Sequence, residues 1–157
     1  RPNTDSQVMS TGPSDIYFRD AILSASPEQL QLMLYEGAIR FARQGREALA
    51  NNDFETSCDK LLRAQRIVEQ MKNGLRPEVN PALCEQLASL YTFAYWRLVD
   101  ANVKHDPALV DEALQILEQQ RDTWRILLEK LQKGDAAQSG EQGRNDPVDA
   151  PRVSLEV

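Results

Sequence analysis

Three polar residues that stand directly before a proline divide the middle of the chain into helices. Ser26-Pro27, Asn80-Pro81 and Asp106-Pro107 each join a side chain that caps a helix N-terminus to the residue favoured at the first helical position. Asp53 is the N-terminal cap of a further predicted helix, and no proline follows it. These signals predict four helices, each with its own N-terminal cap.

Apolar residues follow each start at helical spacing, and no segment alternates with the period of two that is typical of strands. The stripe of the third predicted helix consists of Leu83, Leu87, Leu90, Ala94, Leu98 and Ala101. Helices of about 20 to 27 residues that are joined by short polar loops pack as antiparallel neighbours. We therefore predict an all-α fold, an antiparallel up-and-down four-helix bundle.

The large apolar residues are concentrated in residues 16–133, and both ends of the chain contain few of them. The ends are rich in Pro, Ser, Gly and acidic residues, and cannot bury enough apolar surface to offset the entropy lost on ordering. We expect one bundle domain over residues 16–133, with a disordered tail at 1–15 and a disordered acidic tail at 134–157. Gly134 is expected to end the last helix.

The charge balance excludes some classes of partner. The 157 residues include 24 acidic and 18 basic side chains, for a net charge of -6. A nucleic-acid-binding protein normally has a basic face, so we expect no such binding. No apolar run approaches the ~18 residues of a membrane span, and no signal-peptide pattern is present. These features predict a cytoplasmic protein without membrane insertion, either a monomer or a weak dimer.

One histidine, His105, and two cysteines, Cys58 and Cys84, restrict catalytic and metal chemistry. A single histidine cannot supply a metal site that needs two, and the cysteines do not form a CxxC pair. His105 stands at a predicted helix junction, where a capping or solvated role is the better interpretation. We find no catalytic constellation, and we expect no enzyme activity, no cofactor and no metal.

Several predicted helices have more apolar residues than one buried face needs, which is about three per heptad. The third is apolar on nearly every side, and residues 16–23 form an apolar segment ahead of the first. Two interpretations are open. The additional residues close the back of a tightly wrapped bundle, or they form an external groove for an amphipathic partner helix. In the second case residues 16–23 are a candidate cover for the groove.

A specific run of residues surrounds the first predicted start. Tyr17 is followed by Ser24-Ala25-Ser26-Pro27 and then by Met33-Leu34-Tyr35-Glu36-Gly37-Ala38. This order closely resembles the FliS family of flagellin export chaperones, and residues 97–102 and 121–124 resemble the third and fourth helices of that family. The resemblance covers roughly residues 16–131.

The resemblance implies a cytoplasmic, non-enzymatic helical bundle. Chaperones of this family hold the disordered C-terminal segment of flagellin, prevent its premature polymerisation and deliver it to the flagellar type III export apparatus, with an export-gate component as a further possible partner. The bound segment lies partly as helices in apolar grooves. The resemblance thus agrees with the groove interpretation of the additional apolar residues.

The resemblance also implies contact roles for individual residues. Tyr17 and Ile22 match a mobile N-terminal cover of the groove. The residues that match the first helix near this cover are Leu34, Tyr35 and Ile39. Ala101 and Asn102 match the end of the third helix.

Two aromatic residues depart from the family pattern. Tyr95 and Trp96 stand where the family usually has polar or basic residues. They could enlarge the partner surface, bind a second partner, support self-association or pack against a tail. The alternative function is therefore a structural or regulatory bundle that binds a different amphipathic partner through this pair or through the acidic C-terminal tail.

Overall fold

The computed structural model describes residues 12–142, which contain five α-helices and no strand. The helices are α1 (Pro13–Ser24), α2 (Pro27–Ala50), α3 (Phe54–Asn73), α4 (Pro81–Lys104) and α5 (Pro107–Gln142). Residues 1–11 and 143–157 lie outside the described part of the chain.

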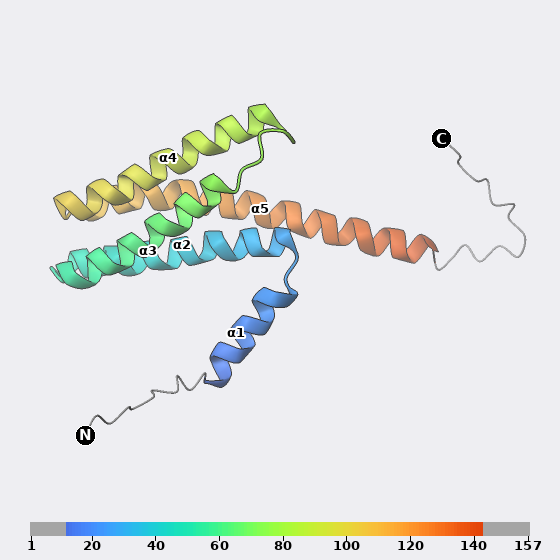
Figure 1. Ribbon diagram of the computed structural model, residues 1–157, viewed down its shortest axis with the longest axis horizontal. Coiled ribbons are helices and arrows are strands. Elements are labelled where there is room, and N and C mark those ends of the chain that lie inside the picture. The colour runs from blue at the N-terminus through green and yellow to red at the C-terminus, as the bar shows by residue number, and fades with distance from the viewer. Residues whose placement is uncertain (1–11, 143–157) are drawn as a thin grey trace, which may run out of the picture.

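Helices α2 to α5 form the antiparallel four-helix bundle that the sequence predicts (Figure 1). Helix α2 packs against α3 and α5, and α4 packs against the same two neighbours. The four helices therefore form a closed ring in chain order, with short connections between consecutive members. The prediction of an all-α, up-and-down bundle is confirmed.

The helix starts lie where the polar caps predict them. Ser26 Oγ accepts a hydrogen bond from Gln29 N (3.2 Å), and Gln29 Oε1 accepts one from Ser26 N (3.0 Å), which together form a capping box. Asp53 and Asn80 cap α3 and α4 through their side-chain oxygens. Because these bonds satisfy backbone N–H groups within one turn, local sequence is sufficient to fix the boundaries.

The core lies between the four helices and consists mainly of aliphatic residues. Its largest fully buried side chains are those of Ile39, Leu61, Val68, Tyr91, Leu98, Val110 and Leu117. Buried alanines fill the narrower places, including Ala38 and Ala42 in α2 and Ala94 and Ala101 in α4. These small residues allow the helix backbones to approach closely.

Ion pairs join α2 to α5 along their exposed edges. They are Arg46–Asp111, Arg43–Glu118 and Glu36–Arg125. The residue number falls along α2 as it rises along α5, so the pairs are consistent with one antiparallel register. Each pair is solvent-exposed and contributes little to stability.

The segment ahead of the bundle differs from the prediction. Residues 13–15, expected in a tail, begin α1, and all residues of α1 are exposed. Ala25 (φ -72°, ψ 142°) and Ser26 (φ -67°, ψ 161°) are extended and direct α1 away from the bundle (Figure 1). In this structure α1 therefore does not cover a groove.

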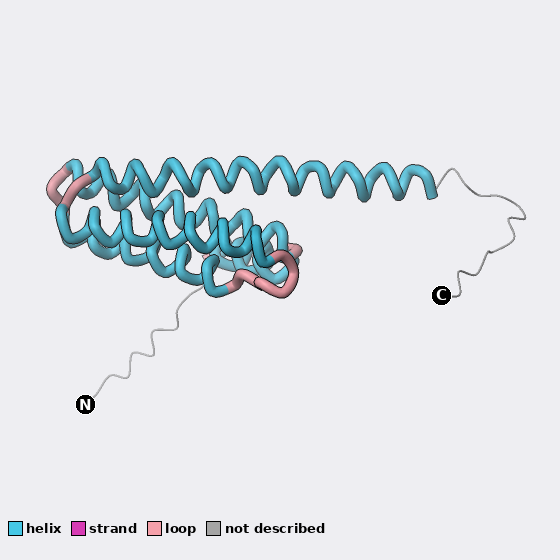
Figure 2. The backbone as a smooth tube through the Cα atoms, turned by 90° about the horizontal axis from the view of Figure 1, so that it is seen from above, coloured by secondary structure: helices cyan, strands magenta, loops and turns pink. Residues whose placement is uncertain are grey.

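The end of the last helix also differs from the prediction. Helix α5 continues through Gly134 to Gln142 and projects beyond the other helices (Figure 2). A helical glycine costs only about 1 kcal/mol relative to alanine, and the residues that follow Gly134 include two alanines and no proline before Pro147. The glycine therefore does not stop the helix, and residues 134–142 are helical in this structure. The rest of the predicted tail lies outside the described residues.

Gly45 marks the closest approach of α2 and α3. A Cβ atom at Gly45 would lie 2.6 Å from Leu61 Cδ2 and 2.7 Å from Leu61 Cγ, and Leu61 is fully buried. We expect Gly45→Ala to lower the free energy of unfolding by about 1–3 kcal/mol, because the buried leucine cannot move aside without strain. Urea denaturation measures this change.

Gly37→Ala is the matched control in the same helix. A Cβ at Gly37 makes ordinary contact with Ile67 Cδ1, at 3.4 Å, so the variant should keep the wild-type stability or gain up to about 1 kcal/mol from helix propensity. Equal destabilisation of the two variants would contradict the close-approach explanation.

Candidate functional site

An apolar groove of about 460 Å³ opens at the end of the bundle where α2 and α4 begin. Helix α5 and the α3–α4 connection complete its walls. Its larger apolar lining residues are Met71, Leu75, Val79, Leu83, Leu87, Trp124 and Leu127. Apart from Glu28 and Arg76, which have opposite charges, the described lining residues carry no formal charge. The groove is therefore suited to apolar side chains of a partner.

The groove exists because the first half of α4 does not pack into the core. Ala94, Leu98 and Ala101 in the second half are fully buried, whereas Leu83 is 48% exposed and Leu87 is half-buried. Helices α4 and α5 diverge toward this end (Figures 1 and 2). The predicted core stripe of α4 is thus correct for its second half and wrong for Leu83, which lines the groove.

Two tyrosines form a polar spot at the floor of the groove. Tyr35 and Tyr91 are 2% and 1% exposed, and their hydroxyl oxygens share a hydrogen bond. Gln31 Nε2 donates to Tyr91 Oη at 3.5 Å, and all three residues line the groove. Burial raises the pKa of both phenols above the ordinary value. Both side chains are therefore neutral hydrogen-bonding groups across the physiological pH range.

Trp124 fixes one wall of the groove. Its Nε1 donates to the backbone oxygen of Glu28 at 2.7 Å, which ties α5 to the first turn of α2. The indole ring lies among the lining residues and packs against the core. This wall is therefore held in place before any partner binds.

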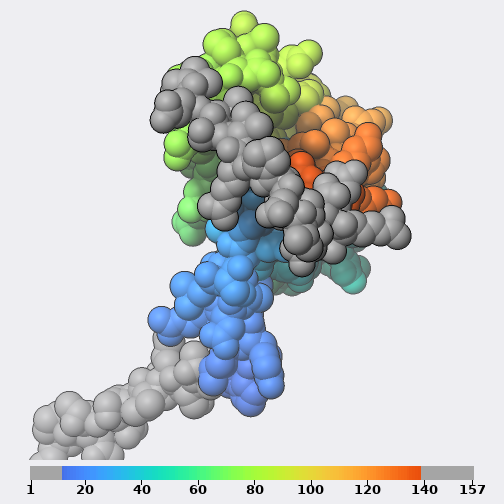
Figure 3. Space-filling model, turned by 90° about the vertical axis from the view of Figure 1, so that its right-hand side faces the viewer, coloured from blue at the N-terminus to red at the C-terminus, as the bar shows by residue number. Residues whose placement is uncertain are grey.

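Further apolar side chains are exposed outside the groove. On α1, Tyr17 is 76% exposed and Leu23 is 75% exposed. On α5, Ile126 and Leu131 are 55% and 49% exposed. Seen from this end, α1 extends away from the bundle as a separate arm (Figure 3). The apolar surface available to a partner is therefore larger than the groove itself.

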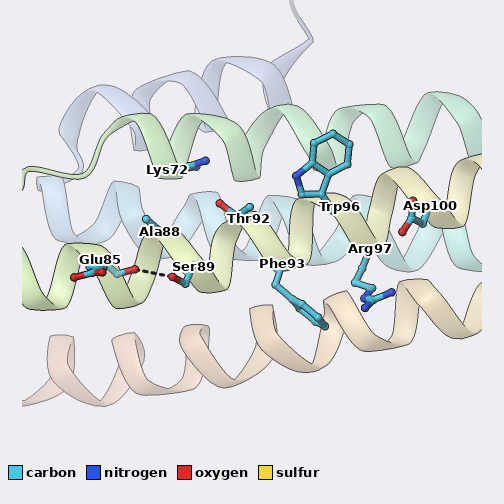
Figure 4. Close-up of a pocket in the computed structure, with 9 residues that line it drawn as sticks. All are labelled: Lys72, Glu85, Ala88, Ser89, Thr92, Phe93, Trp96, Arg97 and Asp100. Atoms are coloured by element: carbon cyan, nitrogen blue, oxygen red, sulfur yellow. Dashed lines mark hydrogen bonds between the residues drawn. The ribbon is translucent and has the colours of Figure 1, made fainter.

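A second, shallower hollow lies on the outer face of α4. Trp96 points toward α3 and Phe93 toward α5, with Lys72 of α3 on the rim (Figure 4). Trp96 is 56% exposed and packs edge-on against Tyr95, with ring centroids 5.4 Å apart. The guanidinium of Arg97 lies 4.8 Å from the Phe93 ring centroid. Of the two departures from the family pattern, Trp96 thus lies on this surface, while Tyr95 is half-buried and packs against the core.

The nine residues predicted as partner contacts are spread over the molecule. Tyr17 and Ile22 lie on the exposed helix α1. Leu34 is half-buried against the core, whereas Tyr35 and Ile39 belong to it, each 2% exposed. Only Tyr35 among them lines the groove.

The other predicted contacts lie away from the groove. Ala101 is fully buried, and Asn102 donates to Cys58 Sγ at 3.7 Å at the opposite end of α4. Tyr95 and Trp96 line a separate cavity between α3 and α4. In this structure Ile39 and Ala101 are packing residues and are not accessible to a partner.

Sequence reasoning missed the residues that form most of the groove. Leu83 and Leu87 line it, yet they have the spacing of ordinary core residues, while Val79 lies outside the predicted helices. The nearest signal was the surplus of apolar residues in α4, which indicated a groove but not its position.

The described residues contain no cluster of three or more His, Cys, Asp or Glu side chains that could hold a metal ion. None of the helices in residues 12–142 is long and apolar enough to cross a membrane.

Comparison with known proteins identifies relatives over most of the chain. The sequence profile of the family described as flagellar protein FliS matches residues 9–131. The flagellar secretion chaperone FliS of Bacillus subtilis is 30% identical over 121 residues, which cover 77% of this chain and 90% of that protein. The Salmonella typhimurium chaperone of the same name is 28% identical, over 74% of this chain and 87% of that protein. A crystal structure of a bacterial flagellar chaperone shares the fold, with a TM-score of 0.63, 23% identity, and coverage of 75% of this chain and 99% of that one.

The buried tyrosine pair makes the free energy of unfolding depend on pH in the alkaline range. Because the pKa of both phenols is raised in the folded chain, the unfolded chain releases their protons first as the pH rises. We expect the free energy of unfolding to fall above about pH 10, by at most ~1.4 kcal/mol per pH unit for each tyrosine. Urea denaturation between pH 8 and 11 measures the slope. An unchanged slope in the Tyr35→Phe/Tyr91→Phe variant would contradict this explanation.

Proposed function

Because the chain belongs to the FliS family of flagellar secretion chaperones, we propose that it is a cytosolic export chaperone for flagellin. In this proposal it binds the disordered C-terminal segment of flagellin, prevents premature polymerisation and assists delivery to the flagellar type III export apparatus. It acts by binding alone, without catalysis or a cofactor, and an export-gate component is a further partner.

The apolar groove beside α4 carries this proposal. Its walls present leucines from two helices and the α3–α4 connection presents Val79, so an amphipathic helix can place apolar side chains against several elements at once. The opposite charges of Glu28 and Arg76 at the lining give no preference for a strongly charged partner. The groove therefore selects for apolar anchors at helical spacing.

A few such anchors are sufficient for useful affinity. Burying one large apolar side chain contributes about 1.5–3 kcal/mol. A disordered segment must also be ordered on binding, at a cost of about 2–5 kcal/mol. Five or six anchors in the groove would offset that cost and give binding in the micromolar range or tighter.

One observation favours a second candidate function. Trp96 and Phe93 are exposed on the outer face of α4 and do not line the groove. A bundle adaptor that binds a different amphipathic partner would use this face. Binding of a partner that is lost in Trp96→Ala and kept in Leu127→Asp would support the adaptor function.

Leu127 offers a direct test of groove binding. It lines the groove and is 45% exposed in the free chain, so its replacement by aspartate should not unfold the bundle. We expect Leu127→Asp to weaken the 1:1 complex with a flagellin C-terminal peptide by at least 10-fold, because an apolar contact becomes a buried charge. Isothermal titration calorimetry measures the affinity and should show a negative heat-capacity change.

Ile126→Asp is the matched control for this experiment. Ile126 is the neighbouring residue and is 55% exposed, but it does not line the groove, so the affinity should change less than 2-fold. No detectable binding of the peptide to the wild-type chain at ~100 µM would end the proposal.

Removal of residues 1–23 tests the role of α1. All residues of α1 are exposed and leave the groove open, so deletion should preserve the helical bundle and the affinity for the peptide. If α1 occupies the groove in some of the molecules, the deletion removes this competitor, and the affinity for the peptide should rise. Calorimetry on the shortened chain measures the change, and a loss of 10-fold or more would show that α1 contacts the peptide directly.

A further inference from the structure

The Tyr35–Tyr91 pair at the floor of the groove has one more hydroxyl hydrogen than its hydrogen bonds use. Tyr35 Oη and Tyr91 Oη share one hydrogen bond, in which one hydroxyl donates and the other accepts. Gln31 Nε2 adds a second donor to Tyr91 Oη. One of the two hydroxyl hydrogens therefore has no acceptor among the described residues.

This hydrogen is buried and lies beside the groove. The two tyrosines are at least 98% buried and both line the groove together with Gln31, so the pair meets the groove only through a small part of its surface. A buried donor that lacks an acceptor destabilises the state in which it occurs. An occupant of the groove that supplies an acceptor avoids this cost in the complex, whereas a purely apolar occupant imposes it.

We propose that the Tyr35–Tyr91 pair selects a partner segment that has an uncharged hydrogen-bond acceptor among its apolar anchors. The acceptor is the side-chain oxygen of an asparagine, glutamine, serine or threonine. This inference rests on the proposed binding of the flagellin C-terminal segment, and it adds a chemical requirement to the apolar spacing.

The surroundings of the pair determine this choice of acceptor. Backbone carbonyls inside a helical segment are already bonded within the helix, so the acceptor belongs to a side chain. A carboxylate would lose its hydration beside Leu87 and Trp124, which makes an amide or hydroxyl oxygen the better acceptor. Both phenols stay protonated because burial raises their pKa, and they therefore act as donors.

The test combines peptide and protein variants in calorimetric titrations of the full chain. Each Asn, Gln, Ser or Thr of the flagellin C-terminal peptide is replaced in turn by an apolar residue of similar size. One replacement should weaken binding to the wild-type chain by about 5- to 30-fold, since a buried donor is left without its acceptor. The same replacement should change binding to Tyr35→Phe/Tyr91→Phe by less than 2-fold.

Two further variants serve as controls. Tyr95→Phe removes a phenol that does not line the groove and should keep the wild-type response to the peptide replacement. Gln31→Met removes the amide and should also keep the wild-type response to the peptide replacement. If the double phenylalanine variant does not fold, as judged by circular dichroism, Tyr35→Phe and Tyr91→Phe are used singly, and at least one of them should lose the response.

The outcomes separate this inference from the proposed function. If the wild-type chain does not bind the unmodified peptide, the proposed function fails. If the peptide binds and every replacement has the same effect on the wild-type and phenylalanine variants, the acceptor requirement is wrong while the proposed function stands. If a peptide replacement weakens binding to Gln31→Met but not to the wild-type chain, the amide oxygen of Gln31 accepts the spare hydrogen. That result would also overturn the inference.

Discussion

The close approach of α2 and α3 at Gly45 is the contact on which the rest of the bundle depends. Leu61 occupies the space that a side chain at position 45 would fill, and the small residues Ala94 and Ala101 of α4 are fully buried at the same end. This end of the bundle is therefore tightly packed. At the opposite end Leu83 is 48% exposed and Leu87 is half-buried, and both line the groove.

Features set by local chemistry could be predicted from the sequence. The starts of α2 and α4 depend on hydrogen bonds within one turn, so Ser26 and Asn80 were sufficient to place them. The division of α4 into a buried half and an open half was not predictable, because Leu83 and Leu98 have equivalent places in the same stripe. Their difference arises from the distance to α5, which is a property of the assembled bundle.

The candidate site shows the same limit. Family resemblance indicated an apolar partner surface, yet Ile39 and Ala101 belong to the core, and Tyr35 lines the groove as a buried residue hydrogen-bonded to Tyr91. Sequence spacing gives the face on which a side chain lies but not whether a neighbouring helix covers that face. The polar spot depends on the meeting of residues 56 positions apart, which no local pattern records.

Helix α5 belongs to two environments within one continuous run of backbone hydrogen bonds. Its first part is held by α2 and α4, while its last turns project beyond the other helices. Helix formation is cooperative along the chain, so the packing of the first part also favours the helical state of the turns beyond it.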